Sequence, residues 1–94
     1  MEKLHIYAQV MWHTEAYIIG DREALTALRD AIDAALTDNH AQLESSTRDG
    51  EGYEVIVQVL PTSDHLWSTL ALPYTDEIAR RTNERTVYPS DITK

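Results

Sequence analysis

The sequence predicts an α+β fold: an antiparallel β-sheet of about five strands in the order β-β-α-β-β-β-α, with one long amphipathic helix and a short C-terminal helix packed on one face. Three observations predict it. Two N-terminal segments have strand character, one long segment has apolar residues at helical spacing, and an Asp-Gly turn separates two further strand-like segments. The 94 residues suit a single α+β domain over residues 1–82, followed by an extended C-terminal tail over residues 83–94.

The first segment, LHIYAQVMW at 4–12, alternates between two sets of side chains with a period of two. This period, with β-branched and aromatic residues, is typical of a half-buried strand. After the short turn HTE, the segment AYIIG at 16–20 predicts a second strand that returns antiparallel to the first.

The segment DREALTALRDAIDAALTDNH at 21–40 predicts the long helix. Asp21 is a natural N-cap, and TDNH supplies the end. Four large apolar residues recur at helical spacing and are expected to be buried against the sheet, with help from Ala24, Ala31 and Ala35: Leu25, Leu28, Ile32 and Leu36.

Residues 40–47, HAQLESST, predict a polar strand near an edge, and residues 53–60, YEVIVQVL, predict an interior strand. The connector RDGEG contains two of the three glycines and predicts a hairpin turn. A phosphate loop would need a basic residue at the right spacing and a helix after it, and a calcium loop would need a helix-loop-helix. Neither pattern is present.

The C-terminal third predicts a fifth strand in HLWSTLAL at 65–72 and a short helix in TDEIARRTNER at 75–85. Of the four aromatic residues that could anchor a partner, Trp12 and Trp67 are expected in the core. Tyr7 and Tyr17 are expected on the surface.

The composition limits the function. The absence of cysteine removes disulfides and thiolate chemistry, and the sequence shows neither a secretory signal nor an apolar run of membrane-spanning length, so we expect a cytoplasmic protein. The four histidines are far apart and match no metal-ligand spacing, and no serine lies in a nucleophile motif. We therefore expect no enzyme activity, no catalytic or metal residue and no cofactor.

The charge is strongly acidic and unevenly distributed. Sixteen acidic residues against eight Lys and Arg give a net charge of -8, which argues against direct binding to nucleic acid or to an anionic membrane. Residues 21–38 carry five acids and two bases, and residues 39–64 carry five acids and one base. Seven of the eight excess negative charges thus lie between residues 21 and 64, which indicates a surface that attracts a basic protein.

The segments AYIIG, DREALTALRDAIDAAL, DGEGYEVIVQV and LALPYTDEIA together resemble small bacterial immunity proteins encoded beside polymorphic or contact-dependent-inhibition toxins. The resemblance covers residues 4–80 and rests on structural motifs. It implies a non-enzymatic cytosolic protein that binds and neutralises a cognate toxin domain, often a basic nuclease. The expected partner-binding residues are an aromatic contact and six acids on the helix and hairpin: Tyr17, Glu23, Asp30, Asp33, Asp49, Glu51 and Glu54.

Two alternatives stay open. A nucleic-acid mimic that inhibits a DNA- or RNA-binding protein predicts the same acidic surface with a broader set of partners. A small ligand-binding or enzymatic module on the face with His5, Tyr7 and Gln9 predicts a concave pocket with convergent polar groups. The sequence also leaves a homodimer open.

Overall fold

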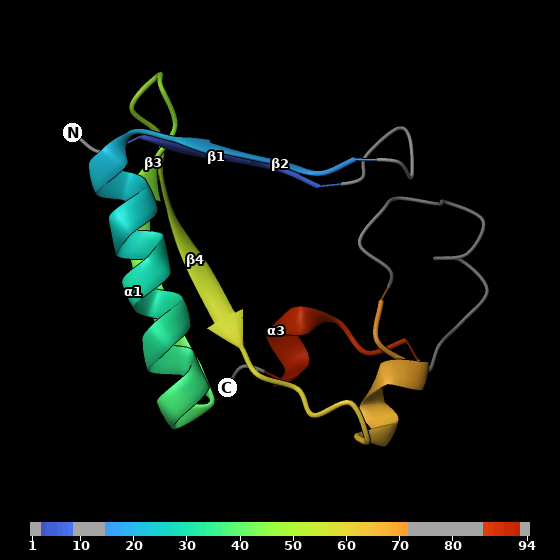
Figure 1. Cartoon of the computed structure of the whole chain (residues 1–94). Coiled ribbons are helices and arrows are strands. Elements are labelled where there is room, and N and C mark those ends of the chain that lie inside the picture. Colours follow the sequence, from blue (N-terminus) through green and yellow to red (C-terminus); the bar gives the residue numbers. More distant parts are fainter. Residues whose placement is uncertain (1–2, 9–14, 72–85, 93–94) are drawn as a thin grey trace.

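The computed structural model describes residues 3–8, 15–71 and 86–92. Along the chain these form two hairpins around a long helix and two short helical turns near the C-terminus (Figure 1). The elements are β1 (Leu4–Tyr7), β2 (Tyr17–Gly20), α1 (Arg22–Asp38), β3 (His40–Ser46), β4 (Gly52–Gln58), the 3-10 helix η1 (His65–Ser68) and α3 (Pro89–Ile92). The predicted α+β class with antiparallel strands and one long helix is confirmed.

The prediction of one five-stranded sheet is wrong. The described residues form four strands in two separate antiparallel pairs, β1 with β2 and β3 with β4. The segment expected to be the fifth strand begins as η1, because the Asp64 carboxylate accepts a hydrogen bond from the Leu66 N–H at 2.9 Å and starts a helical turn. Within the described ranges β4 therefore pairs with β3 alone and lies at an edge, not in the interior of a sheet.

Several contacts between described residues hold the N-terminal hairpin to the rest of the fold, and one of them is the hydrogen bond that the Arg48 N–H donates to Nε2 of His5 at 3.0 Å. Lys3 forms a parallel bridge with Ser46 at the end of β3, and its carbonyl accepts from the Asp21 N–H at 3.1 Å. The Tyr53 hydroxyl donates to the Leu4 carbonyl at 2.5 Å. Leu4 is completely buried and forms the core cluster together with Ala24 and Leu28 of the helix, so the two hairpins and α1 are packed together at this corner.

Both predicted ends of α1 are confirmed. The Asp21 side chain accepts from the Ala24 N–H at 2.8 Å and caps the first turn. At the other end Asn39 adopts a left-handed conformation with φ of 73°, and its N–H donates to the Ala35 carbonyl at 2.6 Å. The helix thus begins and ends where its polar side chains satisfy the free backbone groups.

The core is smaller than the helical pattern predicts. The buried row of α1 is Ala24, Leu28, Ala31 and Ala35. Leu43 and Val55 of the β3–β4 hairpin pack against the cluster that Ala24 and Leu28 form with Leu4. Of the four large residues expected in the core, only Leu28 is buried; the prediction is wrong for Leu25, Ile32 and Leu36. At 3.6 residues per turn these three lie about 90° around the helix from the buried row, because the small alanines are the residues that let the helix approach the sheet.

The β3–β4 turn confirms the predicted hairpin. The Gly50 N–H donates to the Thr47 carbonyl at 3.0 Å, Gly50 has φ of 88°, and the Thr47 N–H donates to the Glu51 carbonyl at 3.0 Å. This is a type I turn followed by a left-handed residue, a geometry that favours glycine at that position. The turn fixes the register Ser46↔Gly52 through His40↔Gln58.

The C-terminal third of the chain differs from the sequence prediction where the structure describes it. The predicted helix over 75–85 lies entirely outside the described residues. The tail was expected to be extended, but residues 89–92 form α3, in which the Tyr88 N–H donates to the Asp91 carboxylate at 2.9 Å and proline occupies the first helical position. Trp67, expected in the core, is exposed, and its indole N–H donates to the Pro61 carbonyl at 2.9 Å.

In the part of the chain that the structure describes, no helix combines the length and the apolar character needed to cross a membrane.

Candidate functional site

The outer face of the β3–β4 hairpin, turned away from α1, is mostly polar, with Ile56 as its one large apolar residue, and carries two acids opposite one another. Leu43 and Val55 face the helix, so the alternate residues of each strand face outward. Their register pairs are His40↔Gln58, Gln42↔Ile56, Glu44↔Glu54 and Ser46↔Gly52. Glu44 and Glu54 are both exposed and are direct cross-strand partners.

The hydrogen bonds at the two ends of the hairpin show what kind of pair this is. The Thr47 N–H donates to the Glu51 carbonyl and the Val59 N–H donates to the Asn39 carbonyl, so the odd-numbered pairs are the hydrogen-bonded ones. Glu44 and Glu54 therefore form a non-hydrogen-bonded pair, in which the Cα atoms approach to about 4.5 Å and the side chains are closest. Two carboxylates in this position repel one another, at a cost of roughly 0.2–1 kcal/mol, and a cation placed between them removes that cost.

The turn beyond this pair carries Asp49 and Glu51, but Asp49 already has a structural role. Its carboxylate accepts from the Thr47 hydroxyl and from the Glu51 N–H at 3.4 Å. The hydrogen bond from Thr47, followed by that from Glu51, lowers the pKa of Asp49 below its ordinary value, against a small opposing effect of desolvation. Asp49 thus orders the turn that sets the register, while Glu51 is exposed beside it.

The three helix acids of the expected set lie elsewhere. Glu23, Asp30 and Asp33 are exposed on the half of α1 that is turned away from the hairpin, so the helix layer separates them from Glu54. Asp30 also forms an ion pair with Arg29 at 3.2 Å. The structure divides the six expected acids into a helix group and a hairpin group.

Tyr17 belongs to neither group. It is exposed, as expected, at the far end of the β1–β2 hairpin, and its hydroxyl donates to the Glu15 carboxylate. This hydrogen bond is the main cause that raises the pKa of Tyr17 above its ordinary value. Tyr7, its cross-strand partner, is also exposed, and its hydroxyl lies 2.7 Å from Nδ1 of His5.

Glu44 was missing from the expected set, although the sequence contained a signal for it. Once the Asp-Gly turn is centred between Thr47 and Glu51, counting outward pairs residue 44 with residue 54. The charge count over a long segment weighted all acids equally and did not use this register. The register therefore identifies Glu44 and Glu54 as the two acids of the outer face.

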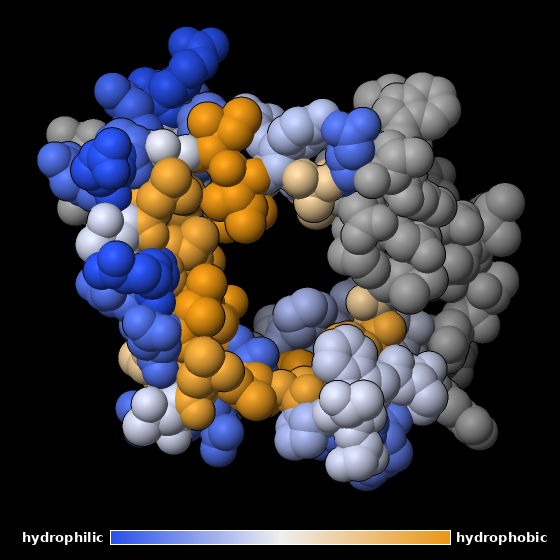
Figure 2. All heavy atoms as spheres, viewed as in Figure 1, coloured by the Kyte–Doolittle hydropathy of each residue, from blue (hydrophilic) through white to orange (hydrophobic). Residues whose placement is uncertain are grey.

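A second unusual feature is an apolar strip on α1, formed by Leu25, Ile32 and Leu36. Their exposed fractions are 40%, 43% and 70%. Figure 2 shows hydrophobic side chains gathered along the flank of α1 that borders an open hollow, on the side where β4 lies. On the β1–β2 hairpin, Ile6 and Ile18 are paired, share the face of the buried Leu4, and are also exposed.

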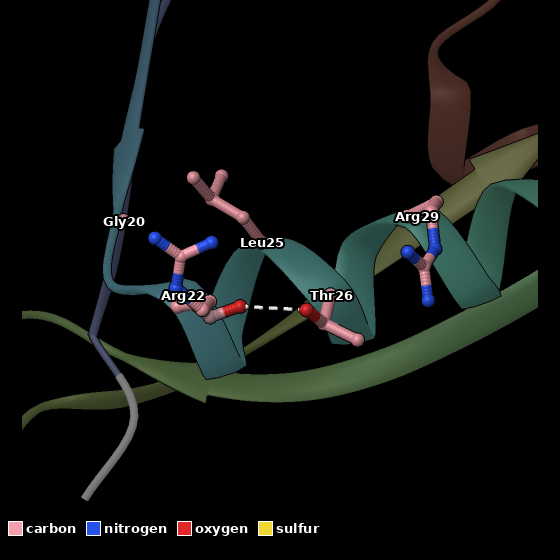
Figure 3. Close-up of a pocket in the computed structure, with 5 residues that line it drawn as sticks. All are labelled: Gly20, Arg22, Leu25, Thr26 and Arg29. Atoms are coloured by element: carbon pink, nitrogen blue, oxygen red, sulfur yellow. Dashed lines mark hydrogen bonds between the residues drawn. The ribbon is translucent and has the colours of Figure 1, made fainter.

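The depressions of the surface are shallow. One, of about 370 Å³, lies at the start of α1 and is lined by Gly20, Arg22, Leu25, Thr26 and Arg29 (Figure 3). The Thr26 hydroxyl donates to the Arg22 carbonyl at 2.8 Å and is thereby occupied. Among the described side chains no three His, Asp or Glu converge in a way that could hold a metal ion.

No family model, curated protein or solved structure matches this chain.

Proposed function

We propose that this chain is a non-enzymatic binding protein of the cytoplasm that binds a basic protein and occludes its active surface, as the resemblance to toxin-immunity proteins implies. The partner is a toxin domain encoded beside it, whose cationic groove is the surface covered.

The observation that carries the proposal is the Glu44–Glu54 pair. A like-charge pair at close cross-strand positions destabilises the isolated hairpin, and both side chains are exposed, so folding alone gives no reason for the arrangement. A lysine or arginine from a partner relieves the repulsion and gains a charge-assisted hydrogen bond. The pair is therefore more favourable in a complex than in the free protein.

The overall charge supports the same conclusion. A net charge of -8 increases the rate at which a basic partner is encountered, and this contribution weakens as salt rises. The helix group of Glu23, Asp30 and Asp33 adds to the long-range field. The hairpin group makes the direct contact.

The experiment starts from the reading frame adjacent to this gene. Its C-terminal domain is expressed with and without this chain, and bacterial growth and complex formation are measured. We expect growth inhibition that co-expression relieves, and a binary complex. Capture of unrelated DNA-binding proteins with no effect of the neighbouring product would instead support a nucleic-acid mimic.

Paired variants locate the contact. Glu44→Gln with Glu54→Gln removes the two charges from the outer face of the hairpin, and Glu23→Gln with Asp33→Gln removes two from the helix group. Both variants change the net charge equally, so both slow association to a similar extent. We expect only the hairpin variant to accelerate dissociation as well, because only its side chains contact the partner.

A further inference from the structure

The outer edge of β4 has backbone groups that no described strand pairs with. In an antiparallel pair, the residues of non-hydrogen-bonded positions direct their N–H and C=O groups away from the partner strand. On β4 these include Glu54, Ile56 and Gln58. Within the described residues β4 pairs only with β3, so this edge presents a row of donors and acceptors that can accept another strand.

The apolar strip of Leu25, Ile32 and Leu36 lies on the same side. It is displaced from the buried row of α1 toward β4, and Figure 2 shows the hydrophobic flank bordering the hollow beside that strand. A strand added to β4 would be about 4.8 Å from it, under this flank of the helix. Its helix-facing side chains would cover the strip together with Val55 and Val57, which are only half-buried.

The other face of the same edge carries one acid, Glu54, next to the exposed Ile56 and to Gln58. Glu54 stands on the outer face of β4 with Glu44 directly behind it on β3. An added strand would place alternate side chains next to Glu54, at the separation of cross-strand neighbours, about 5 Å. A basic side chain fits beside Glu54, and apolar side chains fit the helix-facing row.

We infer that β4 is a docking edge for an extended segment of the protein partner, which adds to the β3–β4 hairpin as a third strand. The segment alternates apolar residues, which contact the strip on α1, with Lys or Arg, which contact Glu54 and Glu44. Backbone hydrogen bonds supply affinity and the two rows supply specificity. The basic row rests on the proposed function; the edge and the apolar strip are independent of it.

The first test uses synthetic peptides as probes. A fluorescent peptide of alternating Lys and Val, seven residues long to match β4, is compared by anisotropy with a block peptide of the same composition and with an alternating Glu and Val peptide. We expect binding of the alternating Lys–Val peptide only. Equal binding of the block peptide would overturn strand addition, because that peptide has the same charge without the alternation.

The second test blocks the edge. The Ile56 N–H points away from β3, so Ile56→Pro removes an edge donor without removing a hydrogen bond between β3 and β4. We expect the affinity for the alternating peptide to fall at least about tenfold, which is the order of one lost hydrogen bond together with the disturbed neighbouring pairs. Unchanged affinity overturns the inference.

Leu36→Gln tests the apolar strip without depending on the proline. Leu36 is largely exposed, so this change should leave the melting temperature nearly unaltered while it weakens the peptide. Ala34→Gln is the matched control, because Ala34 is exposed on the opposite flank of α1. Equal effects of the two variants on the peptide contradict a contact at the strip.

Other occupants of the edge give distinct results. If the chain covers β4 itself, Ile56→Pro lowers the melting temperature in the absence of any peptide; if a second copy covers it, sedimentation shows a dimer that Ile56→Pro dissociates. Either result overturns the inference. If the neighbouring gene product binds through Glu44 and Glu54 but ignores Ile56→Pro, the proposed function stands and strand docking fails. If binding of the neighbouring gene product depends neither on Glu44 and Glu54 nor on Ile56→Pro, both the proposed function and the strand docking are wrong.

Discussion

The hydroxyl of Tyr53 donates to the carbonyl oxygen of Leu4 across 2.5 Å, and so links β4 to β1 over 49 residues of sequence. Since Leu4 is the one large side chain that is completely buried among the described residues, this bond closes the corner where both hairpins meet α1. The bond attaches the N-terminal hairpin to the β3–β4 hairpin, together with the bridge of Lys3 to Ser46 and the hydrogen bond that the Arg48 N–H donates to Nε2 of His5 at 3.0 Å.

Tyr53→Phe should therefore lower the free energy of unfolding by about 1 kcal/mol, the usual net value of a hydrogen bond whose loss leaves an acceptor unsatisfied. Tyr88→Phe, at an exposed site, is the control. Desolvation also raises the pKa of Tyr53 above 10.0, so the folded state holds this proton more tightly than the unfolded chain. The stabilisation by the Tyr53 hydroxyl should be fully present below pH 10 and should be lost as the pH rises above 10. The decline in the free energy of unfolding above pH 10 should therefore be smaller in Tyr53→Phe than in the wild type. Urea unfolding at several pH values measures both effects, and equal stability of the two variants would contradict the role of this bond.

Asp21 gives a prediction at acid pH. Hydrogen bonds from the Ala24 N–H and then the Lys3 N–H lower its pKa below 3.8. The stabilisation is therefore present above pH 3.8 and is lost as the pH falls through the lower, folded-state value. Asp21→Asn keeps a capping acceptor without the charge and should flatten this acid dependence. Asp21→Ala should lower stability by about 1 kcal/mol at neutral pH, and by less at acid pH, where the wild-type carboxylate is protonated. An acid slope that persists unchanged in Asp21→Asn would refute this assignment.

Ser45 has a buried hydroxyl without a hydrogen-bond partner among the described groups. An unsatisfied buried hydroxyl costs about 1–3 kcal/mol, so Ser45→Ala should leave stability unchanged or raise it by up to about 1 kcal/mol. Ser68→Ala is a contrasting change, because the Ser68 hydroxyl donates to the His65 carbonyl at 2.8 Å. Chemical denaturation compares them, and a clear loss of stability in Ser45→Ala would mean that its hydroxyl is satisfied after all.

The local elements could be predicted from the sequence because they depend on local chemistry. Asp21 and Asn39 end a helix by their own hydrogen bonds, and the Asp-Gly turn requires the positive φ that Gly50 adopts. The ends of β2, β3 and β4 were predicted within two residues.

The assembly of these elements could not be predicted in this way. Helical spacing placed Leu25, Ile32 and Leu36 with Leu28 on one broad apolar face, but it does not state which part of that face meets the sheet. The alanines decide this, since they allow the closest approach. Likewise the apolar residues of β4 indicated an interior strand, yet within the described residues its second neighbour is missing, and that discrepancy is the basis for the inferred docking edge.

The candidate site was predicted in part. Charge counting located acids on the helix and the hairpin, and one of them, Glu54, is exposed on the outer face of the hairpin. It could not separate the two layers, and it overlooked Glu44, because facing and pairing are properties of the fold and its register.

The most direct test of the central claim, that the outer face of the hairpin exists to meet a cation, measures stability and binding together in Glu54→Lys. Replacing the like-charge pair with an opposite-charge pair should raise the free energy of unfolding by about 0.5 kcal/mol. In the same variant the affinity for the neighbouring gene product should fall at least about tenfold, because the new lysine repels the basic side chain of the partner that is proposed to bind there. A variant that is less stable than the wild type, or that binds this product as tightly, would contradict the account.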